Sequence, residues 1–253
     1  MTPPTAGPPS SQHLCRREQH TEPRGEERLH GAQARFLRDN GLTIALLSLF
    51  VLFLVGHSVA GHREYNAEQQ SHGALQVDYG SYITSAHFLE SVTENWESEF
   101  FQMFGYVILT AFLFQKGSAE SKSPDEPEAV DRDPRRSRQR RDVPWPVRRG
   151  GLALRLYEHS LSLAFLALFL ASFALHAASG AREFSAEQLE HGEPGVTALA
   201  YLGTSRFWLE SLQNWQSEFL AIAAMVFLSV YLRERGSPES KPVDAPHDQT
   251  GSG

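Results

Sequence analysis

Apolar residues are concentrated in four blocks, and long polar stretches separate these blocks. An α-helix rises about 1.5 Å per residue, so about 20 residues cross the hydrocarbon layer of a bilayer. The second and fourth blocks reach that length only when their helices begin near Asn95 and near Gln213. The pattern therefore predicts four transmembrane helices. Their spans are about 42–60, 96–114, 161–179 and 214–232.

The sequence contains an internal repeat. NWESEF at 95–100 returns as NWQSEF at 214–219, which is 119 residues later. Without any gap, residues 37–122 align with residues 156–241. The alignment pairs His57 with His176, Tyr82 with Tyr201, Trp96 with Trp215, and GSAESK with GSPESK. Each copy holds two predicted spans, so the repeat unit is one helical hairpin with its outer loop.

These patterns predict an all-α membrane protein with four transmembrane helices, arranged as two tandem helical hairpins that are parallel repeats. Short interfacial helices are expected in the outer loops. The tail at 1–40 has few aliphatic residues, so it cannot bury enough apolar surface to order itself. The predicted segments are a disordered cytoplasmic tail (1–40), a first hairpin (41–116), a charged cytoplasmic linker (117–150), a second hairpin (151–235) and a disordered cytoplasmic tail (236–253).

The outer loops carry signals of local structure. Asn66 with Gln69, and Ser185 with Gln188, have the spacing of a capping box and predict the start of a short helix. Glycines at 73 and 192 predict its end, and Gly61 predicts the end of the first span.

The distribution of Lys and Arg predicts the orientation. Basic residues precede the first span, lie between the second and third, and follow the fourth, whereas few lie in the two repeated loops. Because positive flanks stay on the cytoplasmic side, both termini are expected in the cytoplasm, with the chain in the cell (inner) membrane. The arginine cluster at 135–141 is expected to contact anionic lipid headgroups. Acidic residues are interleaved with it, so no nucleic acid is expected.

Composition changes this picture in only two ways. With 21% charged residues and a net charge of −7, the average resembles that of a soluble protein and conceals the apolar blocks. Cys15 is the single cysteine, which excludes an intrachain disulfide and a cysteine-based metal site.

Three segments resemble a family of bacterial multi-pass membrane proteins of unknown function. They are RDNGL at 38–42, HFLESVTENWESEFFQM at 87–103 and LFQKGSAESK at 113–122. The resemblance covers both repeats and implies a membrane location and a bacterial source, without any activity or ligand. The second copy departs from the pattern at Gln216, where the first has Glu97, and at 208–210.

Polar residues inside the predicted spans are the candidates for function, because lipid offers them no hydrogen bonds. His57 and Glu99 lie at similar depth in the first hairpin, as do His176 and Glu218 in the second. We therefore expect two intramembrane pairs, His57–Glu99 and His176–Glu218. Trp96 and Trp215 are expected to be interface anchors.

Three classes of function remain open on the sequence alone. The first is a non-catalytic membrane scaffold or envelope-interaction protein, with interhelical hydrogen bonds as the role of the polar pairs. The second is a small transporter or channel component that uses them. The third is a haem or metal redox carrier with His57, His176, Glu99 and Glu218 as ligands. No catalytic signature is found, no metal site is assigned and no cofactor is expected, while pairing with a second copy of the chain stays open.

Overall fold

The structure, a computed structural model, describes residues 33–251, and its regular elements in that range are all helices. The chain divides into two compact units, Met1–Val59 and Ala60–Gly253, and α2 (Gly41–Ser71) runs across their boundary. Of the predicted disordered tail, residues 1–32 lie outside the described range, whereas residues 33–39 are helical.

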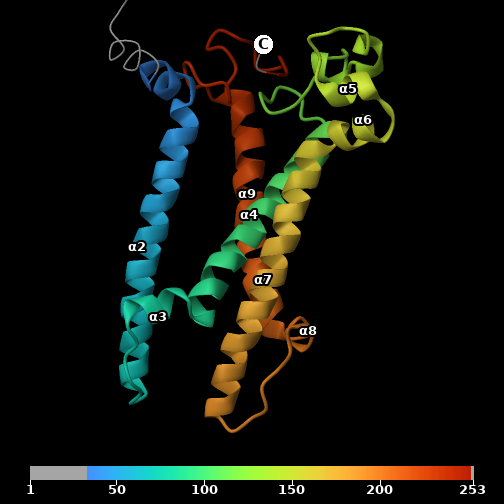
Figure 1. The fold of residues 1–253 in the computed structure, drawn as a ribbon. Coiled ribbons are helices and arrows are strands. Elements are labelled where there is room, and N and C mark those ends of the chain that lie inside the picture. The colour runs from blue at the N-terminus through green and yellow to red at the C-terminus, as the bar shows by residue number, and fades with distance from the viewer. Residues whose placement is uncertain (1–32, 252–253) are drawn as a thin grey trace, which may run out of the picture. The chain divides into compact units, whose positions relative to one another are not determined.

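The second unit is built around three long helices (Figure 1). α4 packs along α7 and, less extensively, against α9. The remaining elements are short, and in chain order the unit after α2 consists of α3 (Tyr79–Ile83), α4 (Ala86–Phe112), the 3-10 helices η1 (Ala129–Asp131) and η2 (Pro134–Ser137), α5 (Trp145–Arg149), α6 (Gly151–Glu158), α7 (Ser160–Glu190), α8 (Ala198–Tyr201) and α9 (Ser205–Tyr231).

The close packing of α4 on α7 differs from the expected hairpin, in which α7 would pack mainly on α9. Small residues make it feasible: Ser172, Ser179 and Gly180 of α7 are buried, and the Thr93 hydroxyl of α4 lies 3.5 Å from that of Ser179. Small side chains let two helix backbones approach closely. The main neighbour of α7 is therefore a helix from the other half of the sequence.

Two of the described helices, α2 and α7, are long and apolar enough to cross a membrane. They contain the predicted spans 42–60 and 161–179. α4 and α9 have 27 residues each but do not meet the same test of apolarity. Their N-terminal halves are polar, with glutamates at 90, 94, 97 and 99 in α4.

Helix bounds correspond between the two halves of the sequence. α2 and α7 both have 31 residues and begin at Gly41 and Ser160, which are 119 positions apart. Hydroxyl groups cap the next long helices: the Ser85 side chain accepts from the Phe88 amide, and that of Thr204 accepts from the Phe207 amide. Local sequence thus sets where these helices begin.

The predicted helix starts at Asn66 and Ser185 are wrong, because both residues lie inside long helices that continue past Gly61 and Gly180. Their side chains bond to the loop backbone instead of capping a helix. Asn66 Oδ1 accepts from the Val77 amide at 2.8 Å, and Ser185 Oγ accepts from the Val196 amide at 2.8 Å. The predicted end at Gly61 is wrong for the same reason. The ends at Gly73 and Gly192 are confirmed, since these glycines follow α2 and α7 with φ of 73° and 75°.

The structure describes the C-terminal segment, which the sequence predicts to be disordered, up to residue 251. The Lys241 side chain is buried, and its ammonium group donates to the main-chain carbonyls of Pro246, His247 and Gln249. The turn that precedes it resembles that of the first half: the Ser121 hydroxyl accepts from the Gln115 amide, and the Ser240 hydroxyl accepts from the Glu234 amide, both at 2.9 Å.

Glycine lets a tyrosine from each outer loop lie directly on a long helix. A Cβ on Gly61 would lie 2.2 Å from the Tyr82 hydroxyl oxygen. A Cβ on Gly180 would lie 2.5 Å from the Tyr201 ring and 2.7 Å from Glu90 Oε1. Tyr82 and Tyr201 are both almost fully buried, so these contacts fasten the loops to the helices.

We expect Gly180→Ala to destabilise the protein by about 1–3 kcal/mol, the usual cost of overpacking a filled site. Tyr201 cannot easily move away, since its hydroxyl group is hydrogen-bonded to both Glu90 and Glu210. Thermal unfolding of the detergent-solubilised protein measures the effect. Gly56→Ala is the matched control, because nothing lies within 4 Å of its added Cβ and alanine favours a helix. Equal melting temperatures for the two variants would contradict the packing argument.

Candidate functional site

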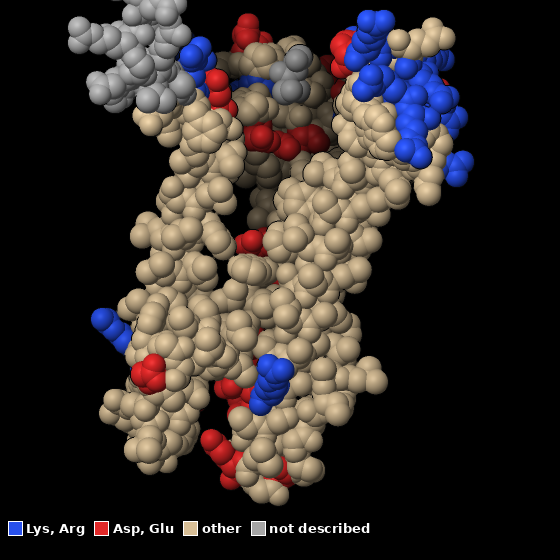
Figure 2. All heavy atoms as spheres, in the orientation of Figure 1, with Lys and Arg blue, Asp and Glu red and all other residues tan. Residues whose placement is uncertain are grey.

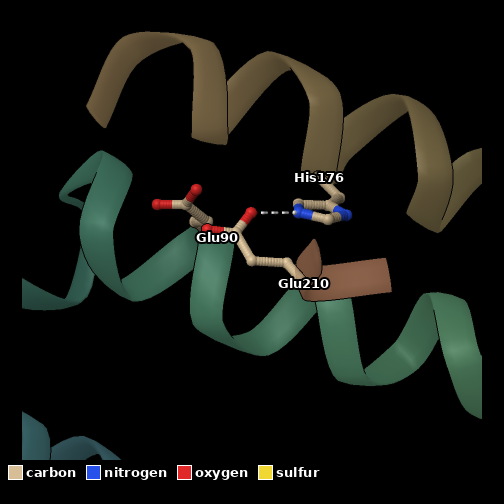
Figure 3. Close-up of side chains that lie close together, drawn as sticks. All are labelled: Glu90, His176 and Glu210. Carbon is tan, nitrogen blue, oxygen red and sulfur yellow. Dashed lines mark hydrogen bonds and ion pairs between the residues drawn. The ribbon is translucent and has the colours of Figure 1, made fainter. Parts of the chain in front are cut away.

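A histidine with two carboxylate partners lies at the centre of the second unit. His176 of α7 is fully buried; its Nδ1 lies 2.6 Å from Glu97 Oε2 of α4, and its Nε2 lies 3.3 Å from Glu210 Oε2 of α9. Figure 3 shows Glu90 and Glu210 next to the imidazole, each on a different helix. The imidazole therefore joins three helices through polar contacts.

Tyr201 and Arg206 extend the site toward the outer loop. The Tyr201 hydroxyl lies 2.7 Å from Glu210 Oε2 and 3.0 Å from Glu90 Oε1. Arg206 Nε donates to Glu210 Oε1 at 2.9 Å, and its Nη1 donates to Glu187. We call Glu90, Glu97, His176, Tyr201, Arg206 and Glu210 the His176 cluster.

Local sequence positions these groups. Glu90, Glu94 and Glu97 are spaced by four and then three residues, so they lie on one face of α4. Arg206 and Glu210 are one helical turn apart on α9, which favours their ion pair. Phe207 between them is fully buried and stacks on the His176 ring with the centroids 4.8 Å apart. Aromatic cover of this kind keeps water away from the imidazole.

Hydrogen-bond counting indicates that the cluster holds one more proton than Tyr201 supplies. A tyrosine hydroxyl has one proton, yet that of Tyr201 contacts both Glu90 and Glu210. It can donate to only one carboxylate, so its second contact requires a protonated carboxyl group that donates to the phenol oxygen. Burial, with the nearby charge of Glu210, raises the pKa of Glu90 to about 7. Glu90 is therefore the carboxyl group that most readily carries this proton.

The same surroundings shift the pKa values of Glu94, Glu210 and Tyr201. Burial and the charge of Glu210 raise the pKa of Glu94. Burial acts in the same direction on Glu210, but hydrogen bonds from His176, Tyr201 and Arg206 outweigh it and hold the pKa of Glu210 below its usual range. Burial and the contact with Glu210 raise the pKa of Tyr201, which stays protonated. The cluster thus combines an ionised Glu210 with a readily protonated Glu90.

The structure gives His176 partners other than the predicted Glu218. Glu97 and Glu210 occupy both of its ring nitrogens, while the Glu218 main-chain carbonyl accepts from the Gln102 side chain at 2.7 Å. Because α7 packs on α4, the carboxylate that reaches the imidazole comes from the other half of the sequence. The pairing of His57 with Glu99 would join the two units and stays a prediction.

The remaining predicted residues lie as follows. Glu99 is exposed on α4, and His57 belongs to the first unit. Trp215 packs on Phe101 with the ring centroids 4.6 Å apart, so at least part of its surface contacts the helix interface. Trp96 is half-buried on α4. The role of both tryptophans as interface anchors stays a prediction.

Sequence reasoning missed Glu90, Glu97, Tyr201, Arg206 and Glu210. Two signals could have indicated them. One is the acidic face of α4, where Glu90, Glu94 and Glu97 recur at helical spacing. The other is the place where the two copies differ: Leu209 and Gln216 occupy the positions equivalent to Glu90 and Glu97, and Ser91 is equivalent to Glu210. Differences between copies that share most of their polar residues mark a site that only one copy builds.

Fold and site together define an all-helical protein with two helices that could cross a membrane and a buried histidine–carboxylate cluster. Within that class, residues 33–252 match the family described as a domain of unknown function, DUF6766, and the chain belongs to this family. No curated protein and no solved structure matches the chain.

We expect Glu97→Gln to lower the free energy of unfolding by about 1.5–3 kcal/mol, the usual contribution of a hydrogen bond to a charged group. The amide keeps the size of the side chain but not its charge, so His176 loses an ionised partner. Denaturant unfolding monitored by circular dichroism measures the loss. Glu99→Gln makes the same chemical change two residues away on an exposed position and should alter stability by less than about 0.5 kcal/mol. A larger loss for Glu99→Gln would be incompatible with this assignment.

Proposed function

We propose that the protein is a non-catalytic scaffold of a bacterial inner membrane, with four membrane spans arranged as two hairpin repeats and both termini in the cytoplasm. In this proposal the His176 cluster joins helices rather than performing a reaction. The exposed arginines of the 132–149 segment contact anionic lipid headgroups, and nucleic acid is not a partner. The source, the number of spans and the orientation are parts of the same proposal.

The observation that carries the proposal is that the polar groups of the cluster bond to one another across different helices. Both ring nitrogens of His176 face carboxylates, Glu210 receives contacts from three side chains, and Tyr201 bridges Glu90 to Glu210. These bonds run between α4, α7, α8 and α9, which is what interhelical hydrogen bonding in a membrane bundle requires. A scaffold needs a fixed arrangement of helices, and this network supplies one.

The distribution of charge supports the membrane location. Figure 2 shows Lys and Arg gathered over the 132–149 segment, whereas the sides of the long helices of the second unit are largely free of charge. Large apolar side chains such as Leu168, Leu170 and Leu175 of α7 are about half exposed. Apolar surface of this extent on a helix is typical of contact with lipid.

Cysteine labelling distinguishes four spans from two. In a Cys15→Ser background, we expect Ser137→Cys in the linker to be protected from a membrane-impermeant maleimide in intact cells. We expect Gln70→Cys and Glu193→Cys, in the two repeated loops, to be labelled. If only α2 and α7 crossed the membrane, the linker would lie outside and the loop at Glu193 inside. Labelling of Ser137→Cys without labelling of Glu193→Cys would therefore exclude the four-span arrangement.

Reconstitution distinguishes a scaffold from a transporter. We expect proteoliposomes that contain the wild-type protein to show no more proton, Na⁺ or K⁺ flux than empty liposomes. We expect His176→Gln to lower the thermal stability of the protein in the same preparation, because the imidazole joins three helices. Ion flux that is present in the wild-type protein and lost in Glu99→Gln would overturn the scaffold proposal in favour of a transporter.

A further inference from the structure

Three side chains of the His176 cluster present metal-ligand atoms to one another. Glu90, His176 and Glu210 each offer one such atom, and these atoms all lie within 4.8 Å of one another (Figure 3). Nitrogen and oxygen ligands of a tetrahedral zinc ion lie about 2.0–2.2 Å from the metal and therefore about 3.4 Å apart. The ligand atoms are thus at most about 1.4 Å farther apart here than around a zinc ion. Small rotations of the two flexible glutamate side chains would bring them together.

His176 is arranged like a histidine that binds a metal through one ring nitrogen while a carboxylate holds the other. Here Nε2 would be the metal ligand and Glu97 holds Nδ1. With a metal ion bound, the 2.6 Å bond from Nδ1 to Glu97 would hold the proton on Nδ1 and leave the lone pair of Nε2, on the side that faces Glu210, for the ion. A proton on Nε2 satisfies the contact with Glu210 in the metal-free protein. A metal ion would replace that proton between Nε2 and Glu210 Oε2, which lie 3.3 Å apart.

A second feature favours a bound cation independently. The Glu97 side chain is fully buried, and its Oε1 has no hydrogen-bond partner in the described part of the chain. Glu90, Glu94, Glu97 and Glu210 lie in the same region, where the Arg206 side chain bonds to Glu210 and is shared with Glu187. Buried carboxylates in such excess are usually paired with cations or coordinate a metal.

We propose that Glu90, His176 Nε2 and Glu210 bind one divalent ion of a first-row transition metal, with Zn²⁺ as the ion that fits the ligands best. One imidazole and two carboxylates suit Zn²⁺, Mn²⁺ and Fe²⁺, whereas Ca²⁺ and Mg²⁺ prefer oxygen ligands alone. Glu97 acts on the metal through His176, and Arg206 orients Glu210. This inference goes beyond the scaffold proposal and departs from the sequence-based expectation of no cofactor.

The test uses the full-length chain with Cys15→Ser, purified in detergent with a tag that contains no histidine and freed of metal with a chelator. Zn²⁺ is titrated by calorimetry, and Co²⁺ is titrated as a spectroscopic probe by its visible absorption. We expect one ion per chain for both metals, with no competition from a large excess of Ca²⁺ or Mg²⁺. Binding of less than one ion per chain, or displacement by Ca²⁺, would overturn the proposal.

Variants separate this site from the other histidines of the chain. We expect His176→Gln and Glu90→Gln each to weaken binding at least a hundredfold. Glu97→Gln should weaken it ten- to a hundredfold and leave one ion per chain, because Glu97 only orients the imidazole. The matched control is His57→Gln, at the equivalent position of the first half, where we expect unchanged affinity. Equal losses in His57→Gln and His176→Gln would overturn the assignment.

X-ray absorption of the zinc-loaded Cys15→Ser chain gives a readout that does not depend on the folding of a variant. We expect a single imidazole and otherwise oxygen ligands around the zinc. A spectrum without an imidazole, or with two or more, would overturn the proposed ligand set. These measurements concern binding alone, so a failure here leaves the scaffold proposal standing, and ion flux in proteoliposomes would leave the metal site standing.

Discussion

The contact between His176 and Glu97 is the interaction on which the arrangement of the second unit depends. Both side chains are fully buried, so their desolvation is offset only while the 2.6 Å contact between them is kept. A shift of α7 along α4 by one turn would leave two buried polar groups without partners. The pair therefore fixes the register of these two helices, and Glu210 and Tyr201 then position α9 and α8 relative to them.

The two halves of the chain differ at the acidic residues of the cluster. The halves share helix lengths, loop glycines and the buried tyrosines Tyr82 and Tyr201. The acidic positions are not shared, since Leu209 and Gln216 are equivalent to Glu90 and Glu97. A second copy of the cluster would bury a second excess of negative charge. With the acidic groups present in one half only, the chain avoids that cost.

Helix positions were largely predictable from the sequence, but the partners of the site were not. Apolar runs, capping hydroxyls and glycines act within one turn of the chain, so the ends at Gly73 and Gly192 could be read directly. Asn66 and Ser185 have the spacing of a cap, but each side chain bonds to the backbone of a loop residue eleven positions away. A local spacing rule cannot distinguish that partner from a cap. The carboxylate that reaches His176 depends on which helices pack together, and that follows from non-local contacts such as that of Thr93 with Ser179.

The two GSxESK turns share one geometry, but the lysines at their ends have different partners. Lys122 forms an ion pair with Asp131, whereas Lys241 is enclosed by carbonyl oxygens of the last residues of the chain. The Lys241 ammonium group has only neutral carbonyl groups as partners. These carbonyls surround it only while the segment through Gln249 is intact. Loss of residues 246–249 would thus expose the buried Lys241 ammonium group to water, whereas Lys122, which pairs with Asp131, makes no such demand on its surroundings.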